Sequence, residues 1–495
     1  MAPMDRTHTK IVIVGAGFGG LGMGVTLKKA GEKDFVILEK SSNVGGVWRD
    51  NSYPGCTCDV PSHLYSFSFA PYRRRDKRYP PQQEILEYLE QVTEDHGLRE
   101  HLHLNKEISK AQFREDENRW DILTTSEQNY SAEIVIFAVG QLHQPRYPDI
   151  PGMRSFEGPA FHSARWNHHV KFQGKRVGII GTGSSAAQML PILADIASSV
   201  TLYQRTPHWV LPKPSAKFSR ASRMILRVPG FHRLYRKALS DGADILLSPI
   251  TRSKTWRQTV EWYAVAALRR QVADRELVDK LMPAYPLGSK RIILDNDFYP
   301  NLTRENVHLV TEPIDSVSYT EIRTKDGASR STDIIVCATG FRASDFLVPI
   351  SVSGRGGHNL NDEWSSGAEA FMGLAVHGYP NLFVIAGPNT FNPAGSNPEM
   401  KELQIEYIMA CLRWKQDTGA EAIEVDCQVA VRYEKWLRTK LEQTVWPESV
   451  DSWYRHETGK VTSPWPMSRR AFARLLRDHQ PQRSFVAWNG ALGPV

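Results

Sequence analysis

Two glycine-rich hexapeptides are the residues of this 495-residue chain whose types and spacing point most directly to chemistry. They are Gly15-Ala16-Gly17-Phe18-Gly19-Gly20 and Gly181-Thr182-Gly183-Ser184-Ser185-Ala186. In such a turn the glycines permit tight curvature, close approach to a pyrophosphate and close packing of a helix on a strand. The following helix presents unpaired N–H groups to the phosphates. We therefore expect two dinucleotide sites, formed by Gly15, Gly17 and Gly20 and by Gly181, Gly183, Ser184 and Ser185.

The residue 24 positions after each first glycine distinguishes the two sites. At the first site it is Glu39, whose carboxylate can accept hydrogen bonds from a ribose diol, as in FAD. At the second it is Arg205, followed by Thr206, and an arginine there can bind a 2′-phosphate. The pattern predicts FAD at the first site and NADPH at the second, although Arg205 could instead be a surface residue at a strand end.

Each turn requires a strand before it and a helix after it. Ile11–Val14 and Phe35–Leu38 are short apolar runs around the first turn, with a helical pattern through Lys29, and Arg176–Ile180 and Val200–Tyr203 repeat this arrangement. We expect an α/β fold with two Rossmann-like dinucleotide-binding domains. The expected divisions are an FAD domain of residues 1–145 plus 335–495, an inserted NADPH domain of residues 150–334, and a helical excursion over about 213–280.

A segment between the two turns carries a family resemblance. Phe156, Gly158, His162 and Trp166 have the spacing Phe-x-Gly-x-x-x-His-x-x-x-Trp and resemble the signature of type I Baeyer–Villiger monooxygenases, whose usual next residue, Pro or Asp, is here Asn167. The resemblance implies an enzyme that uses NADPH and O2 to insert oxygen beside a ketone carbonyl. We expect His162 to organise the connection between the domains rather than to transfer protons.

The resemblance extends over nearly the whole chain and implies further site residues. Gly45-Gly46-Val47-Trp48 is similar to a flavin-contacting Gly-Gly-Thr-Trp, and Tyr53–Asp59 resembles a loop whose final Asp lies near the flavin. Lys290-Arg291 matches the family's 2′-phosphate-binding lysine and catalytic arginine. The remaining matched positions are Tyr65 and Gln141, both cofactor contacts, and Trp453 in Ser452-Trp453-Tyr454, which resembles a loop that closes over the nicotinamide cofactor.

The implied chemistry explains these residue types. In the family, reduced flavin and O2 form a C4a-peroxyflavin that attacks the ketone and gives a Criegee adduct. Arg291 would stabilise the anionic oxygens, Asp59 would orient Arg291, and retained NADP⁺ would exclude water. Outside the resemblance, Asp59 would be read as a loop-capping carboxylate and Lys290-Arg291 as a solvated basic pair.

Other functions remain open at this stage. A related enzyme that oxygenates amines or sulfides would need no arginine at the point of attack. A pyridine-nucleotide disulfide reductase would need two flavin-facing cysteines with several residues between them. Cys56 and Cys58 are separated by one residue and fit that requirement poorly. They also fit a metal site poorly, because a second ligand cluster is missing. A flavin-binding protein without catalysis is the fourth possibility.

Composition adds exclusions and one unexplained feature. Five cysteines and no apolar run of 18 residues predict a reduced, cytoplasmic protein without a spanning helix, and no motif indicates nucleic-acid binding. The expected partners are a small ketone or sulfide and O2; nothing indicates the oligomeric state. Residues 213–254 contain ten Lys or Arg and two Asp, and their excess of eight exceeds the net +7 of the chain. They form either a solvated helical surface or a face for an anionic cofactor or membrane.

Overall fold

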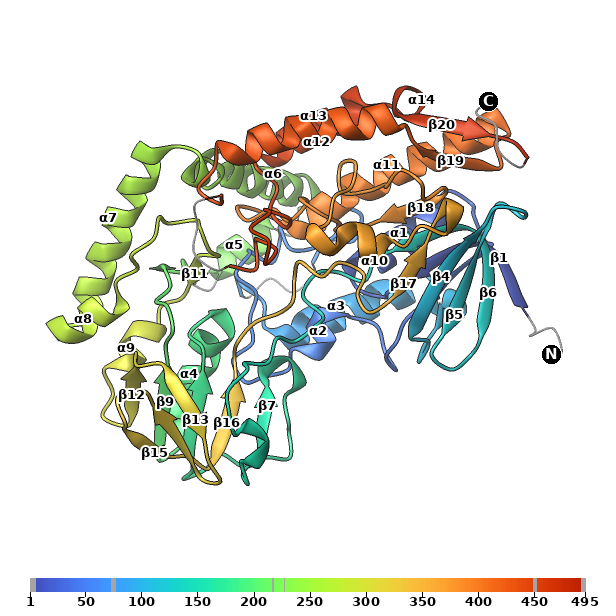
Figure 1. Ribbon diagram of the computed structural model, residues 1–495. Helices are drawn as coiled ribbons and strands as arrows, with labels where there is room; N and C mark the ends of the chain where they lie inside the picture. Colours follow the sequence, from blue (N-terminus) through green and yellow to red (C-terminus); the bar gives the residue numbers. More distant parts are fainter. Residues whose placement is uncertain (1–5, 73–76, 216–217, 227, 448–451, 491–495) are drawn as a thin grey trace.

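The computed structural model describes residues 6–72, 77–215, 218–226, 228–447 and 452–490 (Figure 1). Two sheets dominate it, and each contains the strand that leads into one of the glycine turns. This arrangement confirms the α/β fold with two Rossmann-like units. No helix among the described residues is both long enough and apolar enough to cross a membrane.

The first sheet has eight strands in the order β17-β4-β5-β6-β1-β2-β3, with β18 also paired to β6. Strand β1 (Arg6–Val14), an interior strand of this sheet, pairs in parallel with β6 along its length, but with β2 only from Ile11 onward. The other strands are β2 (Phe35–Leu38), β3 (Leu102–His103), β4 (Ile108–Arg114), β5 (Arg119–Thr124), β6 (Asn129–Phe137), β17 (Ser351–Ser353) and β18 (Leu382–Val384).

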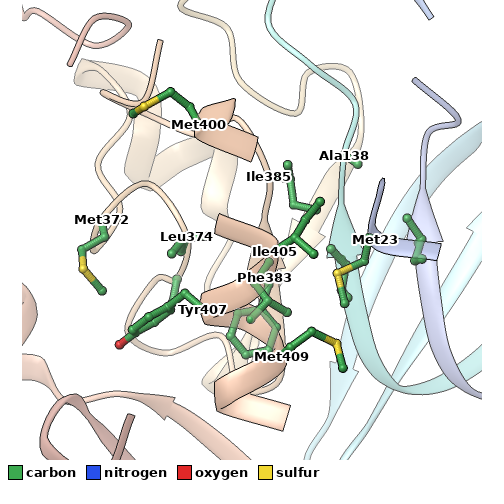
Figure 2. Packing of buried hydrophobic residues seen from close by; sticks show 14 of the residues in the cluster. Met23, Ala138, Met372, Leu374, Phe383, Ile385, Met400, Ile405, Tyr407 and Met409 are labelled. Atoms are coloured by element: carbon green, nitrogen blue, oxygen red, sulfur yellow. The ribbon is translucent and has the colours of Figure 1, made fainter. Parts of the chain in front are cut away.

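Apolar side chains join the helices of this half to the sheet. Helices α1 (Phe18–Lys29) and α11 (Asn397–Thr418) pack against each other, and α3 (Gln82–Asp95) contacts α1. Met23 of α1, Ile405 of α11 and Phe383 of β18 belong to one buried cluster (Figure 2). Burying such side chains contributes roughly 1.5–3 kcal/mol each. The cluster therefore holds α1 and α11 against each other, and residues of both helices line the cavity at the first turn.

Shorter elements complete this half of the molecule. They are α2 (Val47–Asp50), α10 (Leu360–Glu363), α12 (Cys427–Glu442), α13 (Arg469–Asp478), α14 (Pro481–Ser484) and the antiparallel pair β19 (Ala422–Val425) and β20 (Phe485–Trp488).

The second sheet is wholly parallel, with five strands in the order β12-β9-β8-β16-β7. The strands of this sheet are β7 (Ala160–His162), β8 (Arg176–Ile180), β9 (Ser199–Tyr203), β12 (Val307–Val310) and β16 (Ile334–Cys337). Two helices accompany them, α4 (Ser184–Ile196) and α9 (Phe298–Leu302). Two small sheets complete this half: the antiparallel meander β13 (Ile314–Val317), β14 (Glu321–Thr324) and β15 (Ser329–Ser331), and the parallel pair β10 (Val210–Leu211) and β11 (Ile293–Leu294).

Strand β16 lies inside this second sheet and corrects one expected boundary. The sequence placed the return to the first half at about residue 335, which falls within β16. All four residues of β16 are buried, and they pair with β8 on one side and β7 on the other. A fully buried aliphatic strand belongs in the middle of a parallel sheet. The first sheet resumes only at β17.

The two segments that connect the halves run side by side. The amide of Arg146 donates to the carbonyl of Gly340 at 2.9 Å, and the amide of Arg342 donates to the carbonyl of Gln144 at 2.9 Å. The outgoing and returning chain thus form a short hydrogen-bonded seam.

His162, at the end of β7, packs against both connecting segments. Its ring centroid lies 5.4 Å from that of Tyr147 and 5.7 Å from that of Phe341. Burial lowers the pKa of His162 to about 4, so the imidazole is neutral near pH 7. Its position matches the organising role expected from the sequence.

The segment from about 213 to 281 is helical. It comprises α5 (Arg220–Ile225), α6 (Pro229–Leu246), α7 (Lys254–Gln271) and α8 (Arg275–Leu281), drawn in green to yellow-green in Figure 1. α7 contacts β10 and α9 of the second half. α6 instead reaches the first half, because Arg236 donates to the carbonyl of Ser66 at 2.9 Å.

Candidate active site

The first glycine turn is too tight for side chains. Gly15 has φ +103°, and a Cβ on Gly20 would lie 1.8 Å from the carbonyl oxygen of Gly15. Gly17 is the N-cap of α1, so the amino end of that helix faces the cavity beside the turn. Gly46, with φ +54°, approaches it closely, since a Cβ on Gly46 would lie 3.3 Å from the Cα of Gly17. These contacts leave backbone N–H groups lining an open cradle.

Glu39 lies buried beneath this turn. Its carboxylate accepts hydrogen bonds from the amide of Ala16 at 2.8 Å, from the amide of Ser41 at 3.0 Å and from the Arg49 guanidinium at 3.0 Å. The sequence predicted Glu39 at this place but gave no sign of Arg49. The carboxylate therefore supports the turn in addition to facing the cavity that both Glu39 and Arg49 line.

The second glycine turn repeats the geometry of the first. Gly181 has φ +106°, and a Cβ there would lie 2.5 Å from the carbonyl oxygen of Ala338. Gly183 caps α4, and open space surrounds the position of its missing side chain. The residues that follow the turn or the end of β9 and face the same cavity are Ser184, Ser185, Arg205 and Thr206.

Asp59 and Arg291, far apart in the sequence, meet in the cavity as an ion pair. One oxygen, Oδ2 of Asp59, accepts from Arg291 Nε at 3.1 Å and from Nη2 at 2.5 Å. Burial opposes both charges, but the partner's charge outweighs it. The pKa of Asp59 is therefore lowered and that of Arg291 is raised. Both groups stay charged across the physiological range.

Aromatic side chains surround the two ends of this pair. The Arg291 guanidinium lies 5.5 Å from the ring centroid of Phe391, and the Phe391 ring also lies 4.9 Å from the ring of Trp453. Trp48 donates from its indole to the Tyr65 hydroxyl at 3.1 Å. These rings make a mostly apolar wall beside a fixed cation. An interior of this kind strengthens the electrostatic effect of that cation by excluding water.

The remaining predicted residues border the same space. Gln141 donates to the carbonyls of Ala386 and Gly387, each at 3.3 Å, and so ties the loop after β6 to the segment after β18. Val47 opens α2, and Lys290 lies 5.2 Å from the Tyr285 ring centroid.

One cavity of about 1570 Å³ connects all of these features. It runs past both glycine turns and the Asp59–Arg291 pair, and Trp453 also lines it. Gly20 lies behind the turn, against Gly15, where its role is to let α1 pack closely.

Two lysines near this cavity were not predicted. Lys213 donates to the carbonyl of Cys58 at 3.0 Å, next to Asp59, and burial lowers its pKa against the opposing pull of the Asp59 charge. Lys401 projects from α11 to the cavity wall, where burial lowers its pKa to about 8. Within the part of the chain that the structure describes, no acceptor bonds its ammonium. No local motif signals either lysine.

Cys56 and Cys58 also lie at this cavity, but they are reduced and buried. Burial raises the pKa of Cys56 to about 11 and raises that of Cys58 as well. A redox thiol works as the thiolate, which these surroundings disfavour. The geometry argues against a disulfide reductase.

Comparisons with known proteins identify the family of the chain. Residues 12–226, which include both glycine turns, match the family model described as pyridine nucleotide-disulphide oxidoreductase. A Baeyer–Villiger monooxygenase of Pseudomonas aeruginosa is 38% identical over 96% of this chain and 91% of its own length.

Solved structures resemble the whole chain. Cyclohexanone monooxygenase from Rhodococcus sp. Phi1 bound to NADP⁺ has a TM-score of 0.88 at 28% identity, over 98% of this chain and all of that one. A complex of OTEMO with FAD and NADP has a TM-score of 0.89 at 26% identity, with the same coverage. A Baeyer–Villiger monooxygenase is this similar over nearly its full length, and the two glycine turns and the Asp59–Arg291 pair share one cavity, so the chain belongs to the Baeyer–Villiger monooxygenases.

Proposed function

We propose that this chain uses FAD and NADPH to convert a ketone and O2 into an ester or lactone, with NADP⁺ and water as the other products. The single observation that carries this proposal is the cavity that joins both glycine turns to the Asp59–Arg291 pair. A hydride donor, a flavin and a fixed cation can meet in it. The domain division is part of the proposal: residues 1–145 and the chain after β16 bind FAD, and residues from 150 through β16 bind NADPH.

The residues present suit both cofactors. Gly17 and Gly46 carry no side chains, and the position of a Cβ on Gly183 is open space. Pyrophosphates therefore have room at the amino ends of α1 and α4. We assign FAD binding to Gly15, Gly17, Glu39, Gly46, Val47, Trp48, Asp59, Tyr65 and Gln141, and we assign to Gly20, expected from the sequence to bind the cofactor, the support of the turn from behind. We assign NADPH binding to Gly181, Gly183, Ser184, Ser185, Arg205, Thr206, Lys290 and Trp453.

When bound, the flavin supplies the chemistry of hydride acceptance and oxygen activation. Arg291 supplies a cation that no physiological pH removes, and its several N–H groups can hold an oxygen that becomes anionic as the ketone carbonyl is attacked. Asp59 fixes the guanidinium by accepting from both Nε and Nη2. It is a positioning residue that also keeps the Arg291 charge paired in a largely apolar cavity.

The apolar surroundings complete the role of this pair. Phe391 and Trp453 present apolar rings beside Arg291. Exclusion of water strengthens the attraction between the guanidinium and a developing oxyanion.

Product analysis tests the proposal directly. The flavin-loaded enzyme is incubated with NADPH, ¹⁸O2 and a mixed panel of linear ketones, cyclic ketones and sulfides. The expected products are esters or lactones with one ¹⁸O atom, formed with matching consumption of NADPH. Oxidation of the sulfides alone would contradict ketone insertion and favour a heteroatom oxygenase. Purified protein that takes up no flavin would refute the whole proposal.

A further inference from the structure

The helical segment exposes an unusual amount of apolar surface. Sixteen large apolar side chains of the described residues are exposed, and eleven of these lie between positions 224 and 263. Scattered exposed apolar residues are ordinary, but a concentration of this kind marks an interaction site. The oxygenation chemistry proposed above uses none of them.

Helix α6 is the clearest part, because its polar face points inward. His232, Arg236 and Ser240, spaced four residues apart on one side, are buried. Phe231 and Leu234, on the opposite side of the helix, are 50% and 60% exposed. Ile245, on the same outer face four turns later, is 63% exposed. Helices on a protein surface normally have the reverse orientation.

Specific hydrogen bonds hold α6 in this orientation. Arg236 donates to the carbonyls of His63 and Ser66, both at 2.9 Å, and Ser240 donates to a Glu399 carboxylate oxygen at 2.9 Å. Rotating the helix to bury its apolar face would break these bonds and leave buried polar groups unpaired, which is costly. The outward apolar face is thus built into the fold.

The apolar surface continues onto the neighbouring helices. The indole of Trp256, at the start of α7, donates to the carbonyl of Leu246 at the end of α6, at 2.8 Å. We call the combined surface the α5–α7 patch, and its residues are Met224, Ile225, Val228, Phe231, Leu234, Ile245, Leu246, Leu247 and Trp256.

Positive charges surround this patch on the outside. The exposed cations among the described residues between positions 220 and 263 are Arg220, Arg233, Lys237, Arg252 and Lys254. Lys237 forms an ion pair with Asp241, yet its side chain stays 69% exposed.

The acidic residues between positions 220 and 263 turn toward the protein. Asp241 pairs with Arg470 at 2.6 Å, Asp244 accepts from the amide of Arg469 at 2.9 Å, and Glu261 accepts from the amide of Leu287 at 2.8 Å. These are all the acids between positions 220 and 263. The outer surface therefore combines apolar side chains with positive charge.

We propose that the α5–α7 patch docks the enzyme on the surface of a membrane that contains anionic lipid. An apolar helix face with an aromatic residue and adjoining Lys and Arg matches the boundary between acyl chains and anionic headgroups. A second copy of this chain fits less well, because a two-fold contact through the patch would bring the same cations together. The α5–α7 patch is thus a lipid-binding surface. Its assignment depends on the exposed residues and not on the oxygenation reaction.

Vesicle sedimentation of the flavin-loaded enzyme tests this docking. The expected result is co-sedimentation with vesicles of phosphatidylcholine plus phosphatidylglycerol, and much weaker binding to phosphatidylcholine alone or at high salt. Each cation near an anionic surface contributes roughly a factor of five, so the double change Arg233→Gln and Lys237→Gln should lower the partition constant roughly 25-fold. The double change Phe231→Ser and Leu234→Ser should lower it by at least roughly tenfold.

Matched controls come from exposed residues away from the patch. Val431→Ser and Tyr319→Ser alter side chains that are 63% and 65% exposed, and Arg323→Gln removes a cation that is 56% exposed. They should leave vesicle binding unchanged. All variants should keep their flavin content and unfolding temperature, because the altered side chains point outward.

Two outcomes overturn the proposal. One is the absence of vesicle binding, or binding that the patch variants and the controls share equally. The other is an oligomer, measured by light scattering without lipid, that the patch variants dissociate while vesicle binding is absent. That result would assign the patch to a contact between copies of the chain. Either outcome leaves the oxygenase proposal intact, since that is judged from products.

Discussion

Replacing Arg291 by alanine should abolish oxygen insertion while leaving flavin reduction in place. The guanidinium directs Nε and Nη2 to one oxygen of Asp59, at 3.1 and 2.5 Å, and it lines the cavity. Loss of one preorganised donor to an oxyanion lowers kcat roughly 10²–10³-fold, and loss of the whole cation should do at least this. NADPH should still reduce the flavin, with the consumed O2 released as hydrogen peroxide. Arg291→Lys keeps the charge but loses the paired donors, so its rate of oxygen insertion should lie between those of the parent enzyme and Arg291→Ala.

Arg355 provides a matched control. It pairs with buried Glu424 at 2.8 Å, and its side chain is 31% exposed, as is that of Arg291. Arg355 does not line the cavity, so Arg355→Ala should keep full ketone oxygenation. Because both arginines are partly exposed, each change should destabilise the fold by only about 1–2 kcal/mol, less than the ~3–5 kcal/mol of a fully buried pair. Stopped-flow reduction by NADPH, peroxide release and ester yield are measured for all three variants. Ester formation by Arg291→Ala within about threefold of the parent enzyme would refute the role given to the guanidinium.

Three further predictions follow from single residues. Arg205→Ala should lower kcat/KM for NADPH roughly 10- to 100-fold and leave that for NADH nearly unchanged; an equal loss with both would contradict 2′-phosphate binding. Gly20→Ala places a Cβ against the Gly15 carbonyl, so the ratio of flavin to protein absorbance should collapse, whereas Gly242→Ala, in open space, should retain flavin. Burial lowers the pKa of His162 from 6.5 to about 4, so its neutral form stabilises the fold above pH 6.5, and this contribution declines as the pH falls toward 4. Between pH 7 and pH 5 the free energy of unfolding, measured with urea, should fall by about 2 kcal/mol less in His162→Gln than in the parent enzyme. Equal falls in the two proteins would argue that the imidazole is not buried in solution.

The sequence predicted the strands next to the turns because they are short, apolar and bounded by glycine. Phe35–Leu38 and Arg176–Ile180 have the expected bounds, but β1 begins at Arg6 and not at Ile11. Residues 6–10 are all polar, and Arg6–Thr9 pair only with β6, so they lack the two-sided burial that makes a strand visible in the sequence.

Site prediction depended on what a motif can signal. The glycine turns have local patterns, whereas Asp59 and Arg291 drew attention only through the family resemblance. Lys213 reaches the same place from a third segment with no pattern of its own, and only the fold brings it to Cys58. The inward polar face of α6 was also beyond prediction, because a helical period gives two faces without saying which one faces the protein.

The seam between the two connecting segments has a consequence for how such a chain could have been assembled. Gln144 and Arg342, which flank the inserted half, are hydrogen-bonded neighbours. The two ends of a whole nucleotide-binding module therefore lie as close together as the ends of a tight loop. The first half can accept the module without a long connection between its own elements. Because both ends of this half lie at the same place, it is suited to exchange between relatives: a donated domain needs to match its new partner's backbone only at these two adjacent segments.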